Sequence, residues 1–194
     1  MSDPVFYYDF NSPYAYLAAC RIDELFPVAP EWRPIAFGVI VKRIGKVPWS
    51  FAADLTAGFE AIEQRAAARR LPPVRYPAGW PVKTYSLIPL RAAILAADEG
   101  LVRELSHELF RIQFAEGRHL ADEEVVLAAA ERVGMDSDRA RAGLGGAEVK
   151  ERLREATDTA LARGVTGVPT VAVGERLFWG DDRLEEAAAA LVAS

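Results

Sequence analysis

The sequence GVTGVPTVAV, residues 164–173, places two glycines and a proline directly before a run of β-branched and small apolar residues. The run 170–173 is typical of a buried strand. Pro169 is a candidate for a cis peptide bond, which would turn the backbone of Val168 outward, where it can pair with an extended peptide. Because most X-Pro bonds are trans, an ordinary loop proline is the alternative.

A hairpin and a final helix are expected after this strand. Gly174 and Glu175 form a short turn signal, and residues 176–179 are typical of the returning strand. Asp181 and Asp182 then stand at the start of a helix that is apolar on one face. Two adjacent carboxylates at this place could bind an α-ammonium group, or they could cap the helix, where Asp is favoured.

The N-terminal segment predicts a strand, a helix and a second strand. The β-branched and aromatic run 5–8 favours a buried strand. A helix is predicted to start at Pro13, with Ser12 as its N-cap. A second strand is predicted over residues 32–37, at the edge of a sheet or at a strand start, because Pro34 lacks an N–H for the ladder.

Residues 50–163 have a helical pattern that only a proline-rich segment at 71–81 interrupts. The apolar stripes are Val102, Leu105, Leu109 and Ile112, then Val126, Ala130 and Val133, then Val149, Leu153, Ala156 and Ala160. Without this insert the order is β-α-β and then β-β-α, the plan of a thioredoxin-like α/β domain, although ferredoxin-like folds have a similar order. We therefore predict a discontinuous thioredoxin-like domain at 1–49 and 164–194, with an inserted all-helical domain at 50–163.

Composition and charge exclude several classes of protein. The 194 residues are 51% hydrophobic and carry a net charge of −5, which argues against disorder and against a nucleic-acid surface. No uncharged apolar run approaches the ~20 residues of a membrane span, and no signal peptide is apparent, so we expect a cytoplasmic protein. The single cysteine, Cys20, excludes an intramolecular disulfide, a CxxC pair and a cysteine-rich zinc site, and no metal site is predicted.

Ser12 is the first candidate for chemistry. In thioredoxin-type enzymes the loop between the first strand and the first helix carries the reactive thiol, because the helix N-terminus offers unpaired N–H groups and partial positive charge. A serine there cannot exchange disulfides, but its hydroxyl can donate a hydrogen bond to a thiolate that a cofactor brings. The residues alone leave open that Ser12 is only an N-cap.

Several segments together resemble the 2-hydroxychromene-2-carboxylate isomerase family, which is related to kappa-class glutathione transferases and to the DsbA-like thioredoxin group. These segments are 8–18, Arg33-Pro34 with 45–48, and 164–170 with 177–184. The terminal motifs are specific in this order and separation, whereas the middle matches loosely. The resemblance implies a thioredoxin fold with a helical insert, glutathione as cofactor, a small aromatic substrate and a homodimer.

The resemblance also implies a role for each matching residue. By position, Ser12 matches the family's catalytic serine beside the glutathione sulfur, and Val168 pairs by its backbone with the cysteinyl part. Asp181 and Asp182 match the positions that hold the γ-glutamyl end. Lys46 stands where many relatives have asparagine, and it would pair with a glutathione carboxylate as a point charge. The predicted cofactor-binding residues are Lys46, Val168, Pro169, Asp181 and Asp182.

The leading hypothesis is a glutathione-dependent isomerase that converts 2-hydroxychromene-2-carboxylate to trans-o-hydroxybenzylidenepyruvate, or a reaction of that type, through reversible thiol addition. The alternatives are a kappa-like glutathione transferase, which would consume the thiol, and a non-catalytic thioredoxin-like module that binds extended peptides at Val168. A DsbA-like disulfide oxidoreductase is the weakest hypothesis, because no cysteine stands at Ser12 or Ala15. Residues 76–84 depart from the family's pattern, which leaves the substrate more open than the cofactor.

Two further groups of residues, one aromatic and one basic, have a predicted place in the structure. Trp49 and Trp80 lie next to prolines in irregular segments and are candidates for the walls of a ligand pocket. The basic residues Arg65, Arg69 and Arg70 are predicted to form a solvated face.

Overall fold

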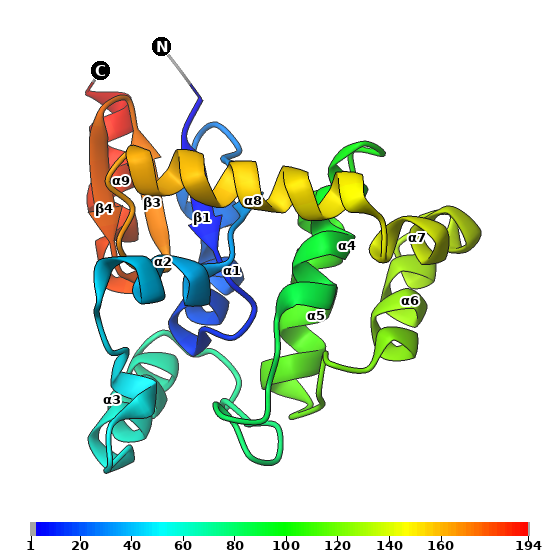
Figure 1. Cartoon of the computed structure of the whole chain (residues 1–194). Coiled ribbons are helices and arrows are strands. Elements are labelled where there is room, and N and C mark those ends of the chain that lie inside the picture. The colour runs from blue at the N-terminus through cyan, green and yellow to red at the C-terminus, as the bar shows by residue number, and fades with distance from the viewer. Residues whose placement is uncertain (1–2, 194) are drawn as a thin grey trace.

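The computed structural model describes residues 3–193, and a four-stranded sheet lies at its centre (Figure 1). The strands are β1 (Val5–Tyr8), β2 (Glu31–Pro34), β3 (Thr170–Val173) and β4 (Arg176–Trp179), in the order β2-β1-β3-β4. β1 pairs in parallel with β2, with Val5 opposite Glu31, and antiparallel with β3, with Val5 opposite Ala172. β4 returns antiparallel beside β3. The sheet therefore places the N-terminal and C-terminal motifs of the sequence side by side.

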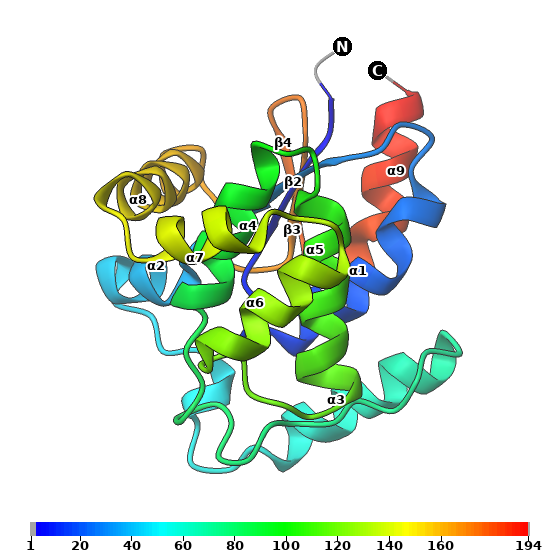
Figure 2. The same cartoon turned by 90° about the vertical axis from the view of Figure 1, so that its right-hand side faces the viewer.

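Helices cover both faces of the sheet and extend beyond one side of it. They are α1 (Pro13–Leu25), α2 (Phe37–Ile44), α3 (Thr56–Ala68), α4 (Leu87–Ala97), α5 (Val102–Phe110), α6 (Glu123–Arg132), α7 (Ser137–Leu144), α8 (Ala147–Ala162) and α9 (Leu184–Val192). Figure 2 shows α1 and α9 on one face of the sheet and α2 with α8 on the other. Helices α4 to α7 gather beside the sheet (Figure 1).

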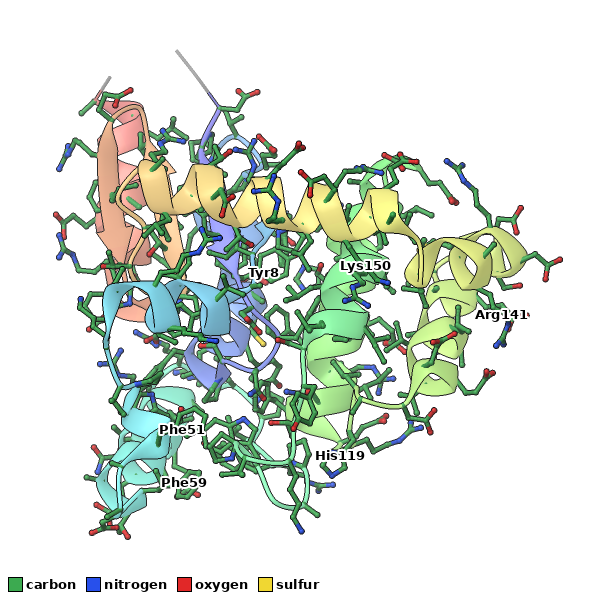
Figure 3. All side chains as sticks on the ribbon, in the orientation of Figure 1. Tyr8, Phe51, Phe59, His119, Arg141 and Lys150 are labelled. Atoms are coloured by element: carbon green, nitrogen blue, oxygen red, sulfur yellow. The ribbon has the colours of Figure 1, made fainter. Side chains whose placement is uncertain are left out.

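The alternation of side chains along β1 explains why both faces are covered, because successive residues of a strand point to opposite faces. Phe6 and Tyr8 belong to the larger hydrophobic core, where the ring of Phe6 lies 4.9 Å from that of Trp32. Val5 and Tyr7 belong to a smaller core with residues of α2 and α8. The Tyr8 hydroxyl (labelled in Figure 3) lies 2.6 Å from the Ser106 hydroxyl, which ties the sheet to α5.

The predicted strand over residues 32–37 is wrong at its C-terminal end. β2 ends at Pro34, and α2 begins at Phe37. The reason lies in two side chains: the Asp9 carboxylate accepts the N–H of Phe37 at 2.9 Å, and the Thr157 hydroxyl accepts the N–H of Ala36 at 3.0 Å. These donors are therefore used at the start of a helix and not in the sheet. The prediction that Pro34 belongs to an edge strand is confirmed.

Helix α8 connects the two parts of the chain. One end packs on α4 beside the helices of the predicted insert, and the helix also contacts α2 and β2 of the thioredoxin-like part (Figure 1). The division into a domain at 1–49 with 164–194 and an insert domain at 50–163 stays a prediction.

Candidate active site

A cleft of about 880 Å³ lies where the loop after β1, the start of α2, the loop before β3 and the turn after β4 meet. All the site residues predicted from the sequence line this cleft: Ser12, Lys46, Val168, Pro169, Asp181 and Asp182. The fold thus gathers residues from both ends of the chain, from Ser12 to Asp182, in one cleft.

Ser12 is both an N-cap and a cleft residue. Its Oγ accepts the N–H of Ala15 at 3.2 Å, as the N-cap prediction requires, and the Ser12 backbone is extended. The hydroxyl donates to the carbonyl of Val168 over 3.5 Å, the far limit of a hydrogen bond. The proton is therefore weakly held and available to a ligand at the N-terminus of α1.

The Val168-Pro169 peptide bond is cis, as predicted. Among residues 3–193, no acceptor bonds the N–H of Val168, and only the long contact from Ser12 reaches its carbonyl. Val168 therefore offers a backbone donor and acceptor beside Ser12, which is what an extended peptide ligand needs.

Two glycines allow the C-terminal motifs to pack together. A Cβ on Gly167 would lie 2.2 Å from Nε1 of Trp179, so the indole occupies the space that a side chain would need. Gly180 has a φ of +115°, which side chains rarely adopt, and its N–H donates to the carbonyl of Pro169 at 2.9 Å. This pairing brings the Asp181-Asp182 turn against the loop that carries Val168.

The prediction of a solvated basic face is wrong for Arg65 and Arg69. Arg65 lies in α3 and Arg69 directly follows that helix, and both bind the carboxylate of Asp181, whose side chain is fully buried. The Arg65 guanidinium lies 2.5 Å from Asp181, 3.3 Å from Asp182 and 5.2 Å from the ring centre of Tyr14. A basic patch can be read from the sequence, but its buried partner 112 or more residues away cannot.

The two adjacent carboxylates consequently occupy different environments. Asp181 is engaged by arginines, whereas the side chain of Asp182 is 52% exposed and lies at the cleft. Lys46 is also exposed and follows Gly45, the left-handed residue that ends α2. The assignment of these residues to glutathione stays a prediction, with Asp182 and Lys46 open to a ligand.

Apolar side chains form the rest of the cleft. Trp49 and Trp80 both line it, with ring centres 5.7 Å apart, so their interpretation as pocket walls is confirmed. Large hydrophobic side chains that are exposed at its rim are Val39, Val47, Phe51, Val82, Tyr85, Leu87 and Trp179. Figure 3 labels Phe51 near the start of α3. Such a surface suits an apolar or aromatic ligand.

Residues 5–192 match the family model of the DSBA-like thioredoxin domain. The chain belongs to the DSBA-like thioredoxin family. The predicted thioredoxin-like α/β fold is thereby confirmed, and a solved 2-hydroxychromene-2-carboxylate isomerase superimposes with a TM-score of 0.86 at 24% identity, covering 99% of this chain and 95% of that one. A probable DsbA oxidoreductase from Streptomyces coelicolor gives a TM-score of 0.77 at 22% identity, covering 98% and 88%.

Curated members of this DSBA-like group confirm the resemblance seen in the sequence. The chain is 29% identical over 192 residues to the 2-hydroxychromene-2-carboxylate isomerase of Sphingobium xenophagum, covering 93% of each protein. It is 26% identical to human glutathione S-transferase kappa 1, covering 92% of this chain and 86% of that protein. These similarities support an isomerase or a glutathione-related enzyme.

Within residues 3–193, every helix is too short or too polar to span a lipid bilayer.

Asp9 is a cleft residue of this DSBA-like chain that the sequence analysis missed. Its carboxylate accepts the N–H groups of Asn11 and Phe37, each at 2.9 Å, and Ser86 adds a side-chain hydrogen bond. Burial raises the pKa of Asp9, while these hydrogen bonds to Asn11, Ser86 and Phe37 oppose the rise. The carboxylate therefore joins the Ser12 loop to α2. An aspartate placed directly after a buried strand was the available signal.

Lowering the pH is expected to stabilise the wild type relative to an Asp9→Asn variant. The raised pKa means that the folded protein binds a proton at pH values where the unfolded chain, with an ordinary value of 3.8, does not. The free energy of unfolding of the wild type, relative to that of the variant, therefore rises as the pH falls through the folded-state pKa of Asp9, and this gain is absent at higher pH. Urea unfolding of both proteins, from about pH 8 down to about pH 4, measures this difference. A difference that stays constant would contradict the prediction.

Proposed function

We propose that the chain is a glutathione-dependent isomerase acting on a small aromatic substrate of the 2-hydroxychromene-2-carboxylate type. The observation that carries the proposal is the Ser12 hydroxyl at the N-terminus of α1, whose only acceptor among residues 3–193 is the carbonyl of Val168 at 3.5 Å, in a cleft with aromatic walls. The names of the curated relatives support the same conclusion.

The residues of the cleft fit glutathione. Val168 has backbone groups free to pair with the central residue of a tripeptide, and Asp182 offers an exposed carboxylate to an α-ammonium group. Lys46 offers an ammonium group to a carboxylate. When bound, glutathione supplies a thiolate that adds reversibly to the conjugated double bond of the ring-opened substrate, so that the bond can rotate, and is recovered.

The protein's own residues make this chemistry accessible. The Ser12 hydroxyl donates a hydrogen bond to the sulfur anion, and the positive end of the α1 dipole favours negative charge at the same point. Trp49 and Trp80 provide an apolar surface for the aromatic ring and exclude water from it. The low dielectric of such a wall strengthens the hydrogen bond from Ser12.

A kappa-like glutathione transferase is the second candidate, favoured by the similarity to glutathione S-transferase kappa 1. It would use the same cleft but consume the thiol. Incubation with 2-hydroxychromene-2-carboxylate separates the two functions, because an isomerase leaves the free thiol constant while product accumulates. Depletion of the thiol in proportion to product would favour the transferase.

Calorimetric titration with reduced glutathione tests the cofactor. We expect a single site with a Kd between about 1 μM and 1 mM, equivalent to ~4–8 kcal/mol. The titration is repeated with the peptide γ-Glu-Ala-Gly, which lacks the sulfur and is expected to bind through the same backbone and charged groups. No heat with several millimolar glutathione would contradict the proposal and favour a peptide-binding module or a different thiol.

A further inference from the structure

Asn11 lies beside Ser12 in the loop after β1 and lines the cleft. Its side-chain Oδ1 is held from two directions. The Thr84 hydroxyl lies 2.6 Å from Oδ1 and 2.9 Å from the carbonyl of Pro81, so its one proton is shared between two acceptors, and Nε2 of Gln113 lies 3.4 Å from Oδ1. In addition, Nε1 of Trp80 donates to the backbone carbonyl of Asn11 at 3.2 Å. Two segments far apart in the sequence thus hold the side chain of Asn11, and the first of them also binds its backbone.

The hydrogen-bond network sets the orientation of the Asn11 amide. Nε2 of Gln113 donates to the carbonyl of Phe10 at 2.9 Å, and a carbonyl can only accept, so Gln113 must turn its nitrogen to this side. The second N–H of Gln113 then needs an acceptor at Asn11, which is Oδ1. Reversing the Asn11 amide would set two donors against each other. Its nitrogen, Nδ2, consequently faces away from the network.

Nδ2 is a free donor at the cleft. Among residues 3–193, no group accepts a hydrogen bond from Nδ2, and this nitrogen is not one of the buried polar atoms that lack a partner. It is therefore accessible, and Asn11 lines the cleft. A donor that is held in place before the ligand arrives needs no reorganisation during reaction.

We propose that Asn11 is a catalytic residue whose Nδ2 donates a hydrogen bond to the carbonyl oxygen of the substrate. The inference rests on the proposed function, because the ring-opened form of that substrate contains a carbonyl conjugated to the double bond. When a bond forms at the β-carbon, the π pair shifts toward the carbonyl oxygen, which gains negative charge. The pair returns when the same bond breaks, so the sequence needs no oxidant and no outside proton. Stabilisation of this charge lowers the barrier in both directions.

The test uses two variants and one control. Asn11→Asp keeps oxygen acceptors for Thr84 and Gln113 but presents an acceptor to the substrate, and Asn11→Leu removes both functions. For each we expect kcat of isomerisation to fall by about 10²-fold or more, with the Kd for glutathione unchanged. Thr84→Val removes one contact to Oδ1 but leaves Nδ2, so its loss is expected to stay below about tenfold. A folded Asn11→Asp variant with wild-type kcat would overturn the assignment.

A second readout does not depend on turnover. A hydrogen bond to the carbonyl of trans-benzylidenepyruvate, bound without thiol, is expected to lower its infrared stretching frequency in the wild type but not in the Asn11 variants. If the wild type lacks isomerase activity but shows this shift, and Asn11→Asp loses it, the proposed function is wrong and only the hydrogen bond from Asn11 to a bound carbonyl stands. An identical frequency in the wild type and in Asn11→Asp would overturn the role of Asn11, whatever the activity.

Discussion

Ser12→Ala is expected to lower kcat of isomerisation by about 10²–10³-fold, the usual effect of removing one donor that stabilises charge in a transition state. The hydroxyl is available because its contact with the Val168 carbonyl is long, at 3.5 Å. Without it, the sulfur anion keeps only the N-terminus of α1 as a source of stabilisation. Steady-state kinetics at saturating glutathione, with the thiolate fraction followed by its ultraviolet absorbance, measure both consequences.

The same substitution also removes a helix cap, and a matched variant separates the two effects. Loss of the bond from the Ala15 N–H to Ser12 costs about 1 kcal/mol of stability. Asp122 caps α6 in the same manner, accepting from Glu124 at 3.0 Å, and does not line the cleft. Asp122→Ala is expected to lose similar stability with kcat unchanged. If Ser12→Ala lowered kcat no more than Asp122→Ala, Ser12 would be only a cap.

Asp181→Asn is expected to lower the free energy of unfolding by about 3 kcal/mol, because it leaves two arginines without the buried anion that pairs with them. The Asp181 side chain is fully buried, and Arg69, which binds it, is only 18% exposed. The expected loss of stability lies at the lower end of the usual range for breaking a buried ion pair, since the Arg65 side chain is 35% exposed and also faces Asp182. Urea unfolding at neutral pH gives the difference.

Asp182→Asn is the control for this prediction, since Asp182 is the neighbouring carboxylate but is half-exposed. An exposed ion pair contributes ~0–1 kcal/mol, so the free energy of unfolding of the Asp182→Asn variant is expected to stay close to that of the wild type. Equal losses of stability in the two variants would show that the burial of Asp181 does not decide its importance.

Local sequence alone was sufficient for most of the elements and for the residues at their ends. Some residues act through the conformation of their own backbone, so their effects are visible within a few positions of the chain. These are the branched and aromatic strand residues, Ser12 before Pro13, and the glycines around Val168. The predicted site residues all line the cleft, and their roles stay a prediction. The locality of these effects also explains the error at residues 35–37, where Asp9 and Thr157 outweigh the local preference for a strand.

Tertiary structure alone decided what the polar groups of the cleft do. The sequence shows that Arg65, Arg69 and Asp181 exist, but only the packing of α3 against the turn after β4 pairs them across more than 100 residues. Asn11 likewise acquires a fixed donor because Thr84 and Gln113, from distant segments, bind its oxygen. Charges and amides take their partners from whatever lies within about 3 Å, and that distance is set by the fold and not by neighbours in the chain.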